Sequence, residues 1–104
     1  MCVSSADHGA TIYQRPVELL QSLIRFDTTN PPGNEAGCIA YIRHLLTEAG
    51  FESAVLAREL GRPNLVTRLA GRGNAPPLLL YGHVDVVTTA DQTWEYPPFE
   101  GKLV

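Results

Sequence analysis

The chain has 104 residues and a mass of 11.3 kDa, which is enough for one domain at most. Hydrophobic residues make up 44% and charged residues 18%, which is typical of a globular chain and excludes a disordered one. The formal net charge of -3 argues against a nucleic-acid-binding module, because such a module carries a basic patch and a high pI.

The start of the chain predicts a flexible N-terminal tail over residues 1–14, because these residues are polar and lack periodicity. The tail has neither the cationic start nor the apolar centre of a secretory signal. No apolar run approaches the roughly 20 residues of a membrane span. Cys2 and Cys38 are too few for a disulfide framework and have no C-x-x-C spacing. We therefore expect a cytoplasmic protein with reduced thiols and no membrane contact.

Two amphipathic helices are predicted after the tail. Pro16 suits the first turn of a helix, and Val17, Leu20 and Ile24 recur at helical spacing as an apolar stripe. The segment 27–33 ends this helix, because it is rich in turn formers and contains two prolines that are predicted to fix a turn.

The second helix is predicted to begin near Asn34, which is a good N-cap residue. Ile39, Ile42 and Leu46 form its apolar stripe. Gly50 suits the position just after the helix, where a left-handed backbone conformation is common.

Strands are predicted next, over residues 51–57 and 64–69, with a turn at 61–63. Leu78 to Val87 starts as a continuous apolar run, which predicts a strand covered on both faces by helices. This order of elements predicts an α/β fold with a layered sheet. In such sheets, polar residues at the carboxyl end of a central strand are where ligands bind.

His83 and Asp85 lie at that end of the predicted strand. Side chains at positions i and i+2 of a strand share a face, so an imidazole and a carboxylate should emerge side by side. A metal-bound histidine usually donates its second ring N–H to a carboxylate, which orients the ring. The H-x-D spacing is compatible with a metal ligand and an orienting acid, and also with a purely structural hydrogen bond.

The remaining candidates receive structural interpretations. A catalytic zinc ion has three protein ligands and an open position, and His83 is the one credible ligand in the sequence. His8 in the tail and His44 on the polar side of the second helix are predicted to be solvated. Trp94 and Phe99 are predicted to pack a loop beneath the site rather than to contact substrate.

Three segments occur in an order that resembles the M20 family of zinc metallopeptidases and amidohydrolases. They are L-I-R-F-D-T-T-N-P-P-G-N-E at 23–35, L-L-Y-G-H-V-D-V-V at 79–87, and Trp94 followed by P-P-F-E-G-K-L at 97–103. The resemblance implies a three-layer zinc-peptidase-like catalytic domain, with a mixed sheet flanked by helices. Residues 15–104 would be its N-terminal part, so that the domain is incomplete in this chain.

By position, His83 resembles a zinc ligand of this family, and Asp85 resembles an active-site acid beside the metal. The family's other ligands and its glutamate base have no match here. The resemblance implies two Zn2+ ions in each complete active site, with Co2+ as a substitute.

The expected function is hydrolysis of an amide or peptide bond in a small-molecule substrate, either an N-acyl amino acid or a short peptide. We expect no nucleic-acid or membrane partner, and the family often forms homodimers through a separate domain. The chain alone should be inactive and should bind zinc weakly, because one ligand does not make a site. The alternative is a non-catalytic α/β binding or scaffold module, in which His83 and Asp85 form a structural pair.

Overall fold

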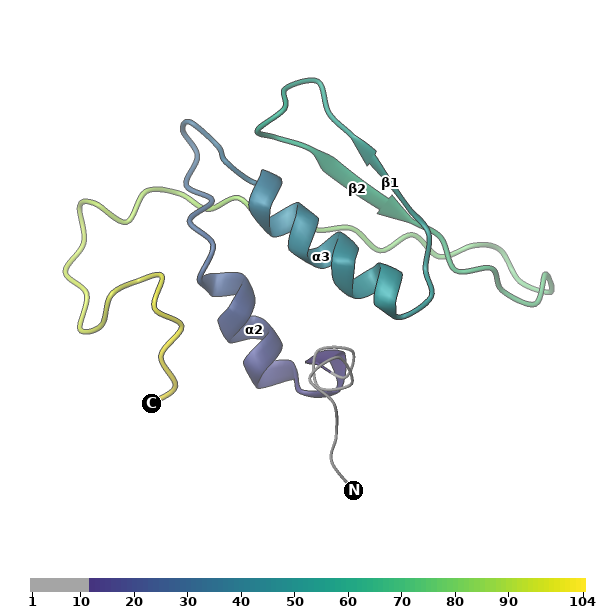
Figure 1. The fold of residues 1–104 in the computed structure, drawn as a ribbon, viewed down its shortest axis with the longest axis horizontal. Helices are drawn as coiled ribbons and strands as arrows, with labels where there is room; N and C mark the ends of the chain where they lie inside the picture. Colours follow the sequence, from purple (N-terminus) through teal and green to yellow (C-terminus); the bar gives the residue numbers. More distant parts are fainter. Residues whose placement is uncertain (1–11) are drawn as a thin grey trace.

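Two helices followed by a β-hairpin make up the regular structure of the chain (Figure 1). The computed structural model describes residues 12–104. The elements in chain order are η1 (Ile12–Gln14), α2 (Pro16–Ile24), α3 (Ala36–Glu48), β1 (Ser53–Leu56) and β2 (Asn64–Thr67). This α/β content confirms the predicted fold class. Among residues 12–104, no helix has the length and apolar character that a membrane span requires.

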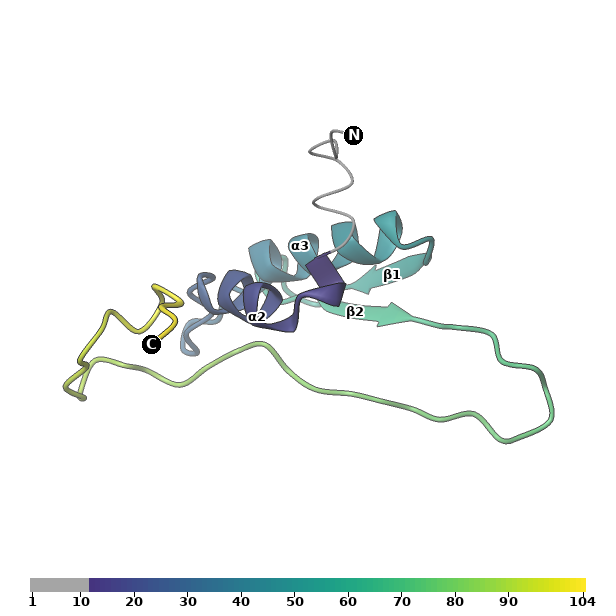
Figure 2. The ribbon, with the colours of Figure 1, turned by 90° about the horizontal axis from the view of Figure 1, so that it is seen from below.

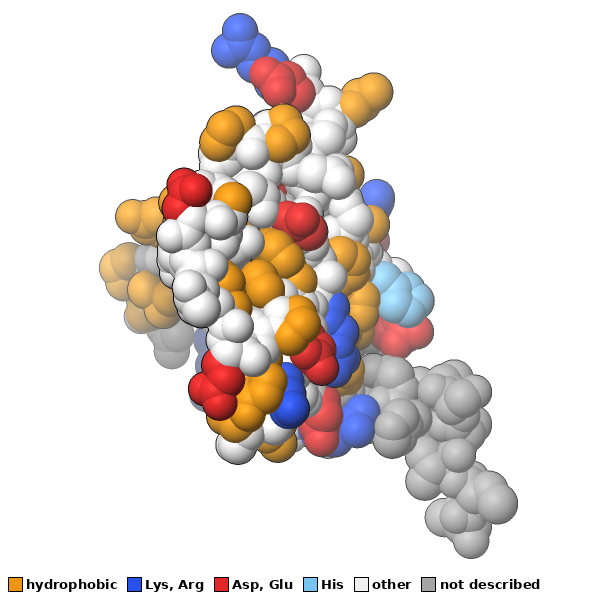
Figure 3. All heavy atoms as spheres, turned by 90° about the vertical axis from the view of Figure 1, so that its left-hand side faces the viewer, with side chains coloured by type: hydrophobic (Ala, Val, Ile, Leu, Met, Phe, Trp, Pro, Cys, Tyr) orange, Lys and Arg blue, Asp and Glu red, His pale blue; other side chains and the backbone are white. Residues whose placement is uncertain are grey.

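The helix α2 begins with Pro16 in its first turn, as predicted. Its apolar stripe of Val17, Leu20 and Ile24 is 51%, 57% and 37% exposed, so the described residues do not cover it. Figure 3 shows apolar side chains open to solvent over one face of the molecule, interleaved with charged ones. The periodicity therefore predicted the helix correctly, whereas the burial of its stripe is not found in the part of the chain that is described.

The start of α3 is fixed by a loop carbonyl group and not by the predicted cap. The N-cap residue is Glu35, one position after Asn34, and it makes no side-chain capping hydrogen bond. The backbone N–H groups of Glu35 and Ala36 donate instead to the carbonyl oxygen of Gly61, at 2.9 and 3.2 Å. The Asn34 prediction is wrong by one residue, because a contact from a distant loop satisfies the helix donors that a cap would otherwise serve.

The end of α3 follows the sequence closely. Gly50 has a φ of 90°, the left-handed conformation expected just after a helix. The N–H of Phe51 donates to the carbonyl of Leu46 at 2.9 Å, and the N–H of Gly50 donates to that of Thr47 at 3.0 Å. This pair of bonds is the Schellman motif, and it turns the chain toward β1.

The hairpin pairs β1 with β2 in antiparallel register, from Ser53 opposite Thr67 to Leu56 opposite Asn64. Both predicted strands are confirmed, with shorter bounds. Seen from below, α3 lies along one side of the hairpin (Figure 2). The buried apolar side chains of the described residues, Cys38 and Ile39, belong to α3 and form a small core there.

The predicted buried strand at residues 78–87 is wrong in this structure. Leu78, Leu79 and Leu80 are 81–82% exposed, and Tyr81 is 94% exposed. Figure 2 shows this segment as a long extended stretch on the side of the hairpin away from α3. A strand exists through its hydrogen-bonded neighbours, and β1 and β2 pair only with each other in the described chain. The apolar run thus predicted an extended backbone, but within residues 12–104 the pairing of the 78–87 segment is limited to one bridge, at Val86.

Residues 12–104 do not form a complete three-layer mixed sheet, in agreement with the expectation that the domain is incomplete in this chain. They provide helices beside one antiparallel pair, and the parallel pairing among them is a single bridge between Thr29 and Val86. Within the predicted tail, Ile12–Gln14 forms a short 3-10 turn. The rest of that tail, residues 1–11, lies outside the described residues.

The C-terminal segment is anchored on α2. The Gln21 Nε2 donates to the carbonyl of Gly101 at 2.7 Å, and Arg25 Nε donates to that of Glu100 at 3.1 Å. Gly101 is buried and has a φ of 68°. A Cβ atom there would lie 2.9 Å from the Gln21 carbonyl oxygen, so the close contact requires glycine. Phe99 in this segment is half-buried. The loop thus packs on the first helix.

Candidate active site

The backbone that carries the predicted site is held by the turn between the two helices. Thr28 Oγ1 donates to the carbonyl of Val84 at 2.6 Å. The N–H of Val86 donates to the carbonyl of Thr28 at 3.1 Å, and the N–H of Asn30 donates to that of Val86 at 2.8 Å. Thr28 is only 3% exposed. These three bonds fix the chain on both sides of Asp85, although no regular strand is present.

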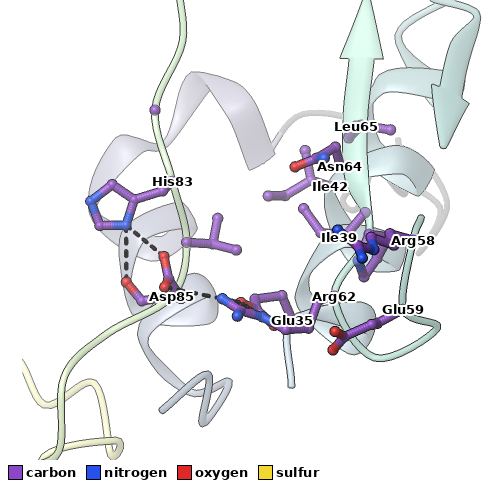
Figure 4. A pocket seen from close by; sticks show the side chains of 13 residues that line it. Glu35, Ile39, Ile42, Arg58, Glu59, Arg62, Asn64, Leu65, His83 and Asp85 are labelled. Atoms are coloured by element: carbon purple, nitrogen blue, oxygen red, sulfur yellow. Dashed lines mark hydrogen bonds and ion pairs between the residues drawn. The ribbon is translucent and has the colours of Figure 1, made fainter. Parts of the chain in front are cut away.

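The structure brings His83 and Asp85 together, as their spacing predicts (Figure 4). His83 Nδ1 lies 2.8 Å from Asp85 Oδ1 and 3.1 Å from the Asp85 carbonyl oxygen. A carboxylate and a carbonyl oxygen can only accept, so the proton of the neutral imidazole belongs on Nδ1. Nε2 then carries the free lone pair. The side chain of His83 is 82% exposed, which leaves this nitrogen accessible.

The second oxygen of Asp85 is held by two other donors. Asn30 Nδ2 donates to Asp85 Oδ2 at 3.0 Å, and Arg62 Nη2 lies 3.4 Å from the same oxygen. The hydrogen bond from Asn30, followed by that from His83 and by the nearby positive charges, holds the pKa of Asp85 below its usual value. Asp85 is therefore an ionised acceptor at neutral pH, with both oxygens engaged.

An ion pair between the half-buried Arg62 and the buried Glu35 lies next to Asp85. Glu35 is 6% exposed, and its carboxylate accepts from Arg62 Nη2 at 2.9 Å and from Arg62 Nε at 3.1 Å. The two Glu35 hydrogen bonds and its charge raise the pKa of Arg62, which stays protonated. Gly33, with a φ of 84°, leaves room for the guanidinium, because a Cβ atom at this position would collide with Arg62.

These side chains line a cleft of about 510 Å³ between the His83 segment and the hairpin side of the molecule (Figure 4). Ile39 and Ile42 of α3 form an apolar part of its wall, and Arg58 lies at its far end. The cleft therefore has an apolar wall, formed in part by Ile39 and Ile42, and charged groups at both ends.

The donor set fits one metal ligand and not a complete metal site. Among residues 12–104, no three His, Cys, Asp or Glu side chains gather closely enough to hold a metal ion. His44 is 66% exposed and pairs with Glu48 at 3.1 Å, so it is solvated as predicted. His8 lies outside the described residues. Nε2 of His83 is accessible and its other nitrogen is held by Asp85, so among residues 12–104 this atom could hold a metal ion.

Sequence reasoning missed three residues of the site: Asn30, Glu35 and Arg62. The first two lie in the N-P-P-G-N-E stretch, which was predicted to fix a turn. Asn30 donates to Asp85, and Glu35 accepts from Arg62, which in turn contacts Asp85. Their presence in a segment that carries the family resemblance was a usable signal. Arg62 lies outside the three segments, so nothing in its neighbourhood pointed to the site.

Comparison with known proteins finds desuccinylases. The chain is 36% identical over 94 residues to the succinyl-diaminopimelate desuccinylase of Methylorubrum populi, an alignment that covers 86% of this chain and 24% of that protein. It is 36% identical over 90 residues to the Ehrlichia canis enzyme of the same name, covering 85% and 23%. It is 35% identical over 89 residues to the succinyl-diaminopimelate desuccinylase of Cereibacter sphaeroides, and this alignment covers 85% of this chain and 23% of that protein.

These similarities confirm the resemblance to the M20 metallopeptidase family over most of the chain. The chain spans about a quarter of the length of the curated relatives it matches. No family model matches the chain, and no solved structure does.

Proposed function

We propose that this chain is part of a metal-dependent hydrolase that cleaves an amide bond, with His83 as a zinc ligand and Asp85 as the acid that orients it. The observation that supports this most directly is the state of His83. Its Nδ1 proton is held by two acceptors of Asp85, and its Nε2 is exposed. This is the arrangement of a metal-bound histidine and its supporting carboxylate.

The residues divide the work between them. Asp85 accepts a hydrogen bond from Nδ1–H of His83, which fixes the ring and makes Nε2 a better electron donor. Asn30 and Arg62 keep Asp85 ionised and in place. Zinc bound at such a site would polarise the scissile carbonyl and lower the pKa of a bound water. In this proposal, the general base and the other metal ligands come from parts of the complete protein other than these 104 residues.

The names of the relatives, succinyl-diaminopimelate desuccinylases, support a proposal for the substrate class. We propose an N-acyl amino acid or a short peptide, cleaved next to a carboxylate. Two Zn2+ ions would occupy the complete site, with Co2+ as a substitute. In this proposal residues 15–104 form the N-terminal part of the catalytic domain of a cytoplasmic enzyme, which forms a homodimer through another domain.

The test is a His83→Ala change in the complete protein, with His44→Ala as the matched control on an exposed helix surface. The proposal predicts that His83→Ala abolishes turnover of an N-succinyl amino acid and removes zinc from one of the sites. His44→Ala should change neither. Full turnover and an unchanged zinc content in His83→Ala would overturn the assignment of His83 as a zinc ligand. A wild-type protein with neither turnover nor bound zinc would favour the alternative, a non-catalytic module with a structural His83–Asp85 pair.

A further inference from the structure

Arg62 lies in the loop between β1 and β2, and it contacts two carboxylates of the site. Its Nη2 atom lies 2.9 Å from Glu35 Oε1 and 3.4 Å from Asp85 Oδ2. One nitrogen thus bridges the start of α3 and the acid beside His83. We infer that Arg62 is a positioning residue: held by Glu35, it fixes the carboxylate of Asp85 and, through it, the proton on Nδ1 of His83.

The two hydrogen bonds to Glu35 make Arg62 suitable for positioning Asp85. Glu35 is almost fully buried, and it accepts from two nitrogens of the same guanidinium. A two-point, charge-assisted contact of this kind fixes the plane of the guanidinium as well as its position. Gly33 lies directly against the Arg62 side chain, so the group is enclosed on that side too. Nη2, which is bound to Glu35, therefore approaches Asp85 from a fixed direction.

The consequence for His83 follows from the two oxygens of Asp85. Asn30 and Arg62 both act on Oδ2, which leaves Oδ1 aimed at His83 Nδ1. With Arg62 removed, one neutral hydrogen bond from Asn30 remains on that oxygen, and the carboxylate gains freedom to rotate. An imidazole that loses its partner exchanges its proton between both nitrogens. The inference rests on the proposed function, because a lone pair on Nε2 matters only if this atom binds a metal.

The test reads the tautomer of His83 in the metal-free chain, from long-range 1H–15N correlations at about pH 8, where an ordinary imidazole is neutral. The wild-type chain should show the proton on Nδ1. Arg62→Met keeps the length of the side chain but removes its charge, which leaves Glu35 buried and unpaired. The double variant Glu35→Gln/Arg62→Met removes that unpaired charge as well. Both variants should lower the ratio of the Nδ1–H tautomer to the Nε2–H tautomer about tenfold, the change expected when a hydrogen bond to a charged acceptor is weakened.

Two comparisons separate positioning from general structural support. Arg62→Lys restores a cation that can reach Asp85, and it should recover most of the wild-type tautomer ratio. Arg58→Met removes an exposed arginine of the same cleft and should leave the ratio unchanged. A folded double variant that keeps the wild-type ratio would overturn the inference. A double variant that fails to fold would also overturn it, since Arg62 would then serve the fold itself.

The measurement involves neither metal nor turnover. An unchanged tautomer ratio would therefore reject the role of Arg62 and leave the proposed zinc ligand standing. Conversely, an absence of zinc at His83 in the complete protein would reject the proposed function without changing the tautomer result.

Discussion

The hydroxyl of Thr28 donates a hydrogen bond of 2.6 Å to the carbonyl oxygen of Val84, which is 56 residues further along the chain. Thr28 lies in the turn that follows α2, and Val84 lies between His83 and Asp85 in the sequence. The bond therefore joins the turn after the first helix directly to the site. Because Thr28 is almost fully buried, water does not replace this bond readily when the hydroxyl is lost.

We predict that Thr28→Val lowers the free energy of unfolding by about 1–3 kcal/mol, since it leaves the Val84 carbonyl without its donor. Urea unfolding monitored by circular dichroism measures this. Thr47→Val is the control, because the Thr47 hydroxyl bonds to a carbonyl of its own helix at an exposed position. The control should change stability by less than about 0.5 kcal/mol. Equal losses in the two variants would show that the Thr28 bond contributes nothing specific.

Gly101→Ala should detach the C-terminal segment from α2. The new Cβ would lie 2.9 Å from the Gln21 carbonyl oxygen, and the φ of 68° also disfavours alanine. In 1H–15N spectra, the resonances of Gln21 and Arg25 should shift. Gly50→Ala is the control, because its φ is 90° but no atom lies within 4 Å of the added Cβ. It should cost about 1 kcal/mol without moving those resonances. Unshifted Gln21 and Arg25 signals in Gly101→Ala would contradict the packing described here.

Asp27 provides a prediction for pH dependence. Its Oδ1 accepts from the Thr29 hydroxyl at 2.6 Å and from the Thr29 N–H at 3.1 Å, and these bonds lower its pKa below the ordinary value of 3.8. A carboxylate with a lowered pKa stabilises the fold above its unfolded-state pKa, and this contribution is lost as the pH falls through the folded-state value. The stability advantage of the wild type over Asp27→Asn should therefore shrink below about pH 4. An advantage that stays constant down to about pH 2 would refute this.

Cys38 should react slowly with thiol reagents. The residue is 2% exposed, and burial raises the pKa of its thiol. In a Cys2→Ser background, Ellman's reagent should modify Cys38 at least about tenfold more slowly in the folded chain than in urea. The control places the thiol on the exposed side of α3, with Cys38→Ser combined with Ala40→Cys. Similar rates for Cys38 and for the control thiol would show that the small core is open.

The elements that could be predicted from the sequence are those whose causes are local. Pro16 begins α2, and Gly50 ends α3 with a left-handed turn. The His83–Asp85 pair is local in the same sense, since two residues on an extended backbone need only alternate to meet. Spacing along the chain was enough for all of these features.

The features that escaped prediction depend on distant partners. The start of α3 is set by the carbonyl of Gly61, so the preference of Asn34 for caps did not decide it. The run at 78–87 was expected to be buried, but burial requires neighbours that the described residues do not supply. Arg62 contacts Asp85, which is 23 residues further along the chain, and no local sequence pattern predicts a contact between residues so far apart.

The central claim is that Nε2 of His83 binds zinc. Anomalous diffraction at the zinc absorption edge, from crystals of the complete protein, tests it most directly. The account predicts a zinc ion about 2.0–2.1 Å from His83 Nε2, with Nδ1 still bonded to Asp85. Zinc bound through Nδ1, or zinc sites that exclude His83 altogether, would contradict it.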